Sequence, residues 1–186
     1  KGRRVANDLP SAMPCCRSVV GGRLQDCADF WDTWCPENSP VPDIIRNGLR
    51  LDFQSTPPTT LHPRPVAVTQ DSAKASALRA EVRSLMDKGA VVPVATPGPG
   101  FYSHVFLVPK KQGTWRLVID LSHLNGFLRV PHFKMETTRS VAAAIQPGGW
   151  AVSLDLKDAY LHIPVHQDHQ KYLRLLFEGR VYQFVA

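Results

Sequence analysis

Residues 152–160 read Val-Ser-Leu-Asp-Leu-Lys-Asp-Ala-Tyr, and this stretch decides how the rest of the chain is interpreted. Its first apolar residues, Val, Leu and Leu, alternate with Ser153 and Asp155. This alternation predicts a β-strand that buries one face and points Asp155 out of the other. A turn follows, and it presents a second carboxylate, Asp158, and an aromatic ring, Tyr160. We therefore expect Asp155 to face a cleft.

The residues before this stretch predict a helix and a hairpin. The helix spans 72–88, with Ser72 as a candidate N-cap, Gly89 as the stop, and an apolar face of Leu78, Val82, Leu85 and Met86. Short strands are predicted at 91–94 and 105–108. The turn at 110–113 joins the latter to a strand at 115–120, which makes a β-hairpin with a basic tip. Alternation places Arg116, Val118 and Asp120 on one face of that strand.

Downstream, the pattern predicts a helix over 135–145, stopped by Pro147-Gly148-Gly149. Two strands follow the 152–160 stretch, at 172–177 and 181–185, and the Glu178-Gly179 turn joins them.

The first third of the chain has a different character. Residues 21–34 carry apolar side chains at near-helical spacing, which favours a small helix packed on the domain over an independent module. Seven prolines between Pro36 and Pro65 predict an extended connector, because proline removes amide donors and disfavours both helix and central strand.

Composition sets limits on the class of protein. The chain has 186 residues and a formal charge of +6, which favours an anionic partner such as nucleic acid. No apolar run or signal-peptide core suggests a membrane or secretory route, so an intracellular, reducing compartment is expected. The four cysteines contain no Cys-x-x-Cys pair and do not predict zinc: Cys15, Cys16, Cys27 and Cys35.

The motifs taken in order resemble a reverse transcriptase, an RNA-directed DNA polymerase, of DIRS- or gypsy-type retrotransposons. The residues that carry the resemblance are Lys88-Gly89-Ala90, Gly100 to Ser103, the region Phe106 to Asn125 with its Lys110-Lys111-Gln112-Gly113 turn, and Asp155 to Tyr160. The resemblance implies an α+β fold, an incomplete right-hand polymerase of fingers and first part of the palm, over residues 71–186. Residues 1–70 are then an irregular, partly helical N-terminal extension with the Pro-rich connector.

The resemblance also implies the chemistry of the 155–160 stretch. Template-directed deoxynucleotidyl transfer uses two divalent ions, Mg²⁺ or Mn²⁺, which take oxygen ligands. Asp155 matches the catalytic aspartate that bridges both ions, and Leu156 matches the residue whose main-chain carbonyl joins it. The implied partners are an RNA or DNA template with its primer, and deoxynucleoside triphosphates.

Further residues match positions that contact the nucleotide. Lysine and arginine on the hairpin can bind phosphate oxygens, arginine through its planar fork. The backbone amides of the turn match those that face the triphosphate, and the aromatic ring matches the one that selects deoxynucleotides. Gln183 matches a strand that leads to a contact with template and nucleotide. The nucleotide-binding set is Lys110, Lys111, Arg116, Asp158, Ala159 and Tyr160.

One departure from the resemblance bears on activity. The Tyr-x-Asp-Asp sequence that supplies the remaining metal carboxylates occurs nowhere in this chain. We therefore expect a fragment that ends before the second catalytic motif and does not polymerise alone.

Three alternatives remain open at this point. The first is a non-catalytic nucleic-acid-binding remnant that uses the hairpin cations and Arg129, and the second is a gene fragment without function. The third is a small metal hydrolase built on Asp155 and Asp158. A metal site at His162, His166 and His169 is not expected, because Pro164 interrupts the helix that it would need.

Overall fold

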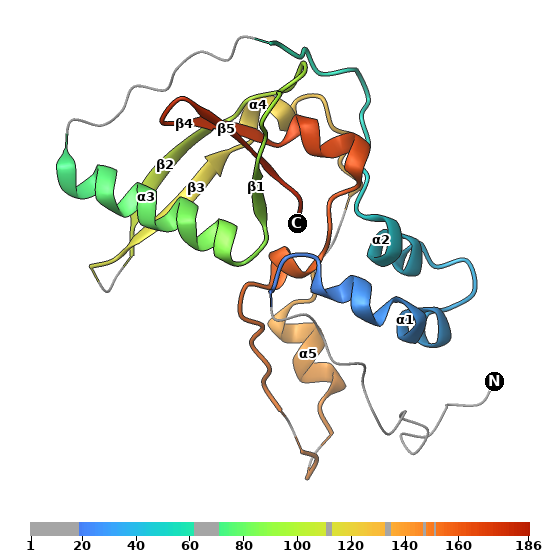
Figure 1. Ribbon diagram of the computed structural model, residues 1–186. Coiled ribbons are helices and arrows are strands. Elements are labelled where there is room, and N and C mark those ends of the chain that lie inside the picture. Colours follow the sequence, from blue (N-terminus) through green and yellow to red (C-terminus); the bar gives the residue numbers. More distant parts are fainter. Residues whose placement is uncertain (1–18, 62–70, 111–112, 133–134, 147, 151) are drawn as a thin grey trace.

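The computed structural model describes residues 19–61, 71–110, 113–132, 135–146, 148–150 and 152–186, and it combines helices with two small antiparallel sheets (Figure 1). One sheet has the strand order β1-β5-β4, formed by Val91–Pro93, Arg180–Phe184 and Arg174–Phe177. The other is the hairpin β2-β3, formed by His104–Pro109 and Trp115–Asp120. The fold is thus mixed helix and sheet, as the sequence predicted.

The long helix α3, Ser72–Asp87, packs on the strands and closes the core. Its apolar face carries the buried Val82, with Leu78 and Leu85 packed beside it, as predicted. Met86, also predicted on this face, is 38% exposed. The N-cap is Asp71 and not Ser72, because the Asp71 carboxylate accepts from the N–H groups of residues 73 and 74. The rest of the buried cluster comes from the strands: Val91, Val105, Leu175 and Tyr182.

Both predicted hairpins are confirmed. In β2-β3 the register places Val108 opposite Arg116, and Leu117 and Ile119 of β3 turn to the core. In β4-β5 the connecting residues Glu178 and Gly179 have φ of 48° and 74°. Two consecutive positive φ values match the tight turn that suits the twist of a hairpin.

The N-terminal part contains short helices: η2 at Arg23–Cys27, α1 at Ala28–Trp34 and α2 at Val41–Asn47. The prediction of an extended connector from residue 36 onward is therefore wrong over α2. Pro40 caps this helix and Pro42 lies in its first turn, where a missing amide donor breaks no intrahelical hydrogen bond. Residues 62–70 of the predicted connector lie outside the described residues.

The strand predicted at 152–156 is not formed, and this is the main correction to the sequence-based fold. None of residues 152–156 belongs to a strand, and the side chains of Val152 and Leu154 are 83% and 86% exposed. A strand needs a hydrogen-bonded neighbour, and in the described part of the chain no other segment pairs with this one. Asp155 is therefore exposed and does not lie at the end of a strand, contrary to the prediction.

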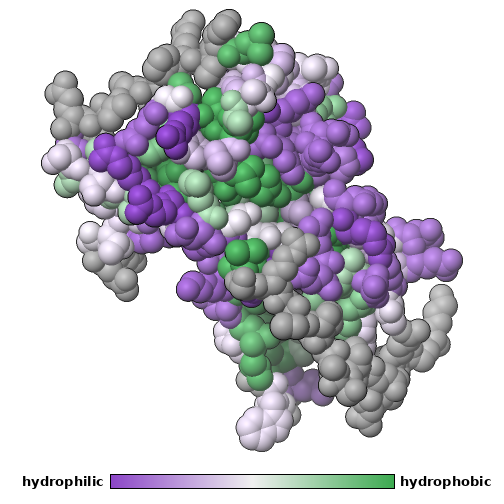
Figure 2. All heavy atoms as spheres, viewed as in Figure 1, coloured by the Kyte–Doolittle hydropathy of each residue, from purple (hydrophilic) through white to green (hydrophobic). Residues whose placement is uncertain are grey.

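The remaining helices are short. The helix predicted at 135–145 is α5, Thr138–Ala144, which begins with a capping box at Thr137 and buries none of its residues. Between β3 and α5 lies α4, Ser122–Asn125, and after the 155–160 stretch come η3, Ala159–His162, and η4, Gln167–Tyr172. Figure 2 shows apolar side chains on the lower part of the molecule, the region where α5 and residues 152–156 lie in Figure 1.

Candidate functional site

The turn that follows Asp155 is held by an ion pair between Asp158 and Lys88, the residue that caps the C-terminus of α3. Asp158 has φ 55°, in the left-handed region that aspartate tolerates better than most residues. Its Oδ1 lies 2.8 Å from Nζ of Lys88, and both side chains are mostly buried. The hydrogen bond from Lys88 holds the pKa of Asp158 below its usual value, against an opposing effect of burial. The turn is thus a defined structure.

The other candidate residues of this stretch are open to solvent. Asp155, Leu156 and Tyr160 are all exposed, Tyr160 by 92%. Ala159 opens η3 directly after Asp158. In the described residues, no backbone carbonyl outside the helices and strands accepts a hydrogen bond from the N–H groups of Asp158, Ala159 or Tyr160.

The hairpin residues lie at a separate place in the molecule. The N–H of Lys110 donates to the carbonyl of Thr114 at 2.7 Å and the N–H of Gly113 donates to the carbonyl of Lys110 at 3.1 Å, which closes the β2-β3 tip. Arg116 is exposed and forms no ion pair among the described residues, and Lys111 lies outside them. In Figure 1 the backbone of this tip lies apart from that of residues 152–157.

Gln183 is engaged inside the sheet. Its Oε1 accepts from Nε of Arg174 at 3.2 Å and its Nε2 donates to Oε1 of Gln170 at 3.1 Å. Arg174 also donates from Nη1 to the carbonyl of Gly98 at 2.7 Å. Both ends of the Gln183 amide are therefore used by the protein itself.

Two histidines predicted not to bind a metal tie the N-terminal part to η4. The Nδ1 of His169 accepts from the backbone N–H of Leu51 at 2.8 Å, and Arg50 contacts the Nε2 of His166. The two imidazole rings meet edge to face, with centroids 5.9 Å apart. In the described residues, no group of three or more His, Cys, Asp or Glu side chains is placed to hold a metal ion.

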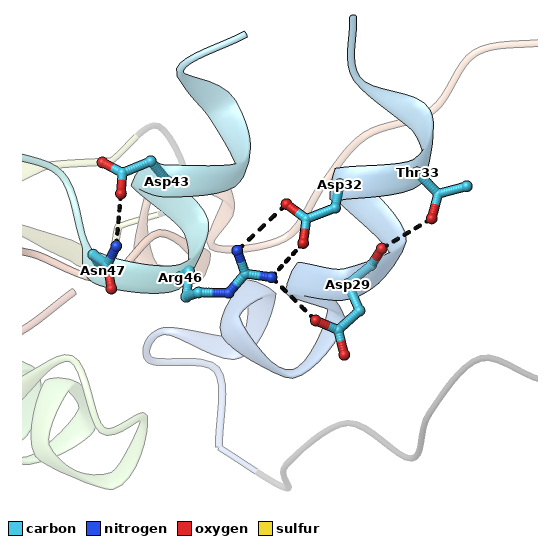
Figure 3. Close-up of polar contacts among 6 residues, drawn as sticks. All are labelled: Asp29, Asp32, Thr33, Asp43, Arg46 and Asn47. Carbon is cyan, nitrogen blue, oxygen red and sulfur yellow. Dashed lines mark hydrogen bonds and ion pairs between the residues drawn. The ribbon is translucent and has the colours of Figure 1, made fainter. Parts of the chain in front are cut away.

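A second charged cluster joins α1 to α2. Figure 3 shows the guanidinium of Arg46 on α2 pointing at the carboxylates of Asp29 and Asp32 on α1. The Nη2 of Arg46 lies 3.1 Å from Oδ1 of Asp29, and Asp32 contacts the same group. All three side chains are substantially exposed, so the cluster fixes the two helices loosely.

Sequence reasoning missed the contacts that hold the turn. In the sequence, Lys88 was part of a motif but had no predicted role. Periodicity and spacing gave no signal that Gly21 and Gly22, whose N–H groups donate to the carbonyls of Lys88 and Leu161, lie at this turn. Local patterns report on neighbours in sequence, whereas Lys88 and Asp158 are 70 positions apart. The cysteines Cys15 and Cys16 lie outside the described residues.

Within the described residues, no helix combines the length and apolar character that crossing a bilayer requires.

The comparisons with known proteins find similarity to polyproteins of retroviruses and of a transposon. No protein-family model matches it. The Gag-Pol polyprotein of bovine immunodeficiency virus (strain R29) is 30% identical over 100 residues, which is 53% of this chain and 7% of that protein. The Pol protein of human endogenous retrovirus group K member 9 is 32% identical over 114 residues, 59% of this chain and 10% of that protein. The Transposon Tf2-3 polyprotein of Schizosaccharomyces pombe is 31% identical over 82 residues, 44% of this chain and 6% of that protein.

A solved structure supports the likeness at the level of fold. The crystal structure of prototype foamy virus protease-reverse transcriptase matches with a TM-score of 0.54 and 17% identity, covering 73% of this chain and 18% of that one. This chain spans a tenth or less of the length of the three polyproteins named above. The chain is thus a homologue of retroviral and transposon polyproteins, and its fold is similar to that of a viral protease-reverse transcriptase.

Proposed function

We propose that this chain is part of a retrotransposon reverse transcriptase of the DIRS or gypsy type, comprising the fingers and the first part of the palm. One observation carries the proposal. The chain is homologous to a retroviral Pol protein. Along the chain, a β-hairpin with Lys110 at its tip comes before a turn in which Asp158 has a left-handed conformation, and this is the order that the resemblance requires. The reaction of the longer protein is template-directed addition of deoxynucleotides to a primer.

The two parts of the site have separate roles in this proposal. Lys110 and Arg116, with Lys111, contact the phosphates of the incoming deoxynucleoside triphosphate. The hairpin and the turn lie apart in this structure, so we propose that they come together around one nucleotide in the longer protein. There the amides of Asp158 and Ala159, which donate to no backbone carbonyl outside the helices and strands of the described residues, face the same triphosphate. Tyr160, exposed on the turn, contacts the sugar. Gln183 does not contact the nucleotide in this proposal and influences template binding through β5, the strand on which it lies.

The residues present do not make up a complete metal site. Mg²⁺ takes six ligands in octahedral geometry, and Asp155 with the carbonyl of Leu156 supplies only two ligand groups. The other described carboxylate of the turn, Asp158, is held by Lys88. We therefore propose that Mg²⁺ or Mn²⁺ binds in the longer protein, where further carboxylates join Asp155, and that this chain alone does not polymerise.

Incorporation of labelled deoxynucleotide onto a primed template tests this function directly. The purified chain with Mg²⁺ should give no signal above that of Asp155→Ala. A longer protein from the same element, extended beyond residue 186, should polymerise and lose activity on the same substitution. Incorporation by the present chain that Asp155→Ala abolishes would show that the proposed inactivity is wrong.

A second candidate function is nucleic-acid binding without catalysis. The chain carries a formal charge of +6, and Lys110 and Arg116 are exposed beside the hairpin tip. Phosphate contacts of this kind release counterions, so affinity falls with salt and needs no divalent ion.

Binding of a primed duplex, measured by fluorescence anisotropy over a range of salt with and without EDTA, tests this candidate. Lys110→Gln with Arg116→Gln should reduce the slope of log affinity against log salt by about 0.9 for each lost phosphate contact. The exposed Arg180→Gln, which removes one charge elsewhere, is the matched control. Equal slopes for all variants would exclude the hairpin as the contact surface.

A further inference from the structure

Three segments that are far apart in the sequence meet at the 158–161 turn. The N–H of Gly21 donates to the carbonyl of Lys88 at 2.7 Å, and the N–H of Gly22 donates to the carbonyl of Leu161 at 2.9 Å. Nζ of Lys88 donates to Oδ1 of Asp158 at 2.8 Å, and the N–H of Leu161 donates to the carbonyl of Asp158 at 2.9 Å. These five residues form a closed set of contacts, which we name the turn clamp.

The N-terminal side of the turn clamp requires glycine. A Cβ on Gly21 would lie 2.1 Å from the carbonyl oxygen of Gly89, so the two backbones approach too closely for any side chain. Gly22 has φ 66°, a conformation that L-residues rarely adopt. The pair Gly21-Gly22 therefore makes backbone contact with both α3 and the turn, and other residues cannot replace it without displacing the segment.

The preceding residues contact the turn through Lys157, whose carbonyl oxygen lies 3.1 Å from Nε2 of His162. Residues 152–157 take part in no backbone-to-backbone hydrogen bond among the described residues, and Leu156 is 71% exposed. The position of Asp158 and Ala159 is thus set mainly from the N-terminal part of the chain and from Lys88 at the end of α3.

A second contact continues the same attachment. Leu49 and Val165 form a parallel bridge, in which the N–H of Leu49 donates to the carbonyl of Pro164 at 2.7 Å and the N–H of His166 donates to the carbonyl of Leu49 at 3.0 Å. The chain from 158 to 166 therefore lies against residues 21–22 at one end and against residue 49 at the other.

We propose that Gly21, Gly22 and Lys88 are positioning residues for the triphosphate-binding turn, so that the N-terminal extension forms a working part of the nucleotide site. This inference rests on the proposed function, because it assigns the turn to a nucleoside triphosphate. Gly21, Gly22 and Lys88 act through Asp158 and Leu161 and do not touch the nucleotide. Their effect is to keep the amides of Asp158 and Ala159 in one arrangement before the nucleotide binds.

Amide hydrogen exchange followed by mass spectrometry tests the positioning role. Gly21→Ala introduces the overlap with Gly89, and Lys88→Met removes the ion pair while leaving the backbone unchanged. Peptides covering 158–165 should exchange about three- to tenfold faster in both variants, while peptides from the core strands stay protected and show that the fold is intact. Gly98→Ala is the matched control, since a Cβ there meets no atom within 4 Å. Lys88→Arg should restore protection.

Binding of a metal-free deoxynucleoside triphosphate in the presence of EDTA, by isothermal titration, separates this inference from the proposed function. The Kd of Lys88→Met should rise about three- to tenfold, while its affinity for duplex nucleic acid at the same salt stays unchanged. Triphosphate binding as tight in Lys88→Met as in the unaltered chain, or unchanged exchange at 158–165, would overturn the positioning role. Exchange at 158–165 can depend on Gly21 and Lys88 as predicted while the unaltered chain binds no triphosphate. That result would support the turn clamp and show that the proposed role of the turn in triphosphate binding is wrong.

Discussion

Arg174 on β4 lies opposite Gln183 on β5, and its Nε donates to the Gln183 Oε1 at 3.2 Å. The same guanidinium donates from Nη1 to the carbonyl of Gly98 at 2.7 Å, so a loop and two strands meet at one cation. Arg174 is buried, and among the described residues it forms no ion pair. Uncharged acceptors therefore hold a charged group inside the protein.

Replacing this arginine should destabilise the fold strongly. Arg174→Met leaves the Gly98 carbonyl and the Gln183 amide without their donor, and hydrogen bonds to charged groups contribute about 1.5–3 kcal/mol each. We expect a loss of about 2–4 kcal/mol in the free energy of unfolding, measured by urea denaturation. The exposed Arg180→Met is the matched control and should change it by less than about 0.5 kcal/mol. Similar effects of the two substitutions would contradict a structural role for Arg174.

Gly48 gives a test of close backbone approach. It has φ 92°, and a Cβ would lie 2.5 Å from the backbone nitrogen of His166. Gly179 has φ 74° but meets no atom within 4 Å. Gly179→Ala should therefore cost about 1 kcal/mol from the backbone conformation alone, and Gly48→Ala should cost at least about 2 kcal/mol. Thermal unfolding of the two variants compares them, and equal losses would show that the contact at His166 is not tight.

The contact between Leu51 and His169 predicts a dependence of stability on pH. The Leu51 N–H donates to Nδ1 of His169, which must be unprotonated to accept. Burial, followed by the charges of His166 and Arg50, lowers the pKa of His169 from the ordinary value of 6.5. Between the folded and unfolded pKa values of His169, the unfolded chain binds more protons than the folded chain. The contribution of the neutral His169 to the free energy of unfolding is therefore complete above pH 6.5 and is lost as pH falls through the folded pKa.

Denaturant unfolding at a series of pH values measures this effect. His169→Gln should remove the part of the pH dependence that lies below 6.5, while the exposed His132→Gln should keep it. A pH profile that is the same with and without His169 would show that the Leu51 contact does not require the neutral ring.

Lys88 and Asp158 should be coupled energetically. Their side chains are 31% and 20% exposed, so a double-mutant cycle with Lys88→Met and Asp158→Asn should give a coupling of about 1 kcal/mol at pH 7, allowing for solvent screening. The pKa of Asp158 is lowered from 3.8, mainly by the hydrogen bond from Lys88. The coupling is therefore complete above pH 3.8 and disappears as pH falls through the folded pKa. A coupling near zero at pH 7 would contradict the ion pair.

The unpaired segment 152–156 gives a contrast with the core. Leu154 is 86% exposed and Leu175 is fully buried. Leu154→Ala should change the free energy of unfolding by less than about 0.5 kcal/mol, whereas Leu175→Ala should cost about 2–5 kcal/mol. A large loss for Leu154→Ala would mean that this segment packs as a strand in solution.

Sequence patterns alone predicted the elements that depend on neighbouring residues. The apolar face around Val82 determined helix α3, because residues three and four apart lie on one side of a helix. The Lys110–Gly113 and Glu178-Gly179 turns determined the two hairpins, since the residues that permit each turn are themselves part of it. The order of motifs that suggests a polymerase is equally a property of the sequence.

Alternation at 152–156 predicted a strand that the structure does not form. The alternating pattern states which face can be buried, but pairing depends on a second segment that supplies donors and acceptors. In the described part of the chain no segment does so. The alternating pattern is thus necessary for a half-buried strand but is not sufficient to form one.

Only the tertiary structure decided which distant residues meet. Lys88 and Asp158 are 70 positions apart, and Leu51 and His169 are 118 apart. A lysine, a glycine or a histidine has no preference for a partner at such a separation, so the pairing follows from how α3, the sheets and the N-terminal segment pack. The sequence by itself determined the helix, the hairpins and the residues of the turn. The packing of the whole chain determined that the N-terminal glycines hold that turn, because contacts between distant segments form only when the core brings them together.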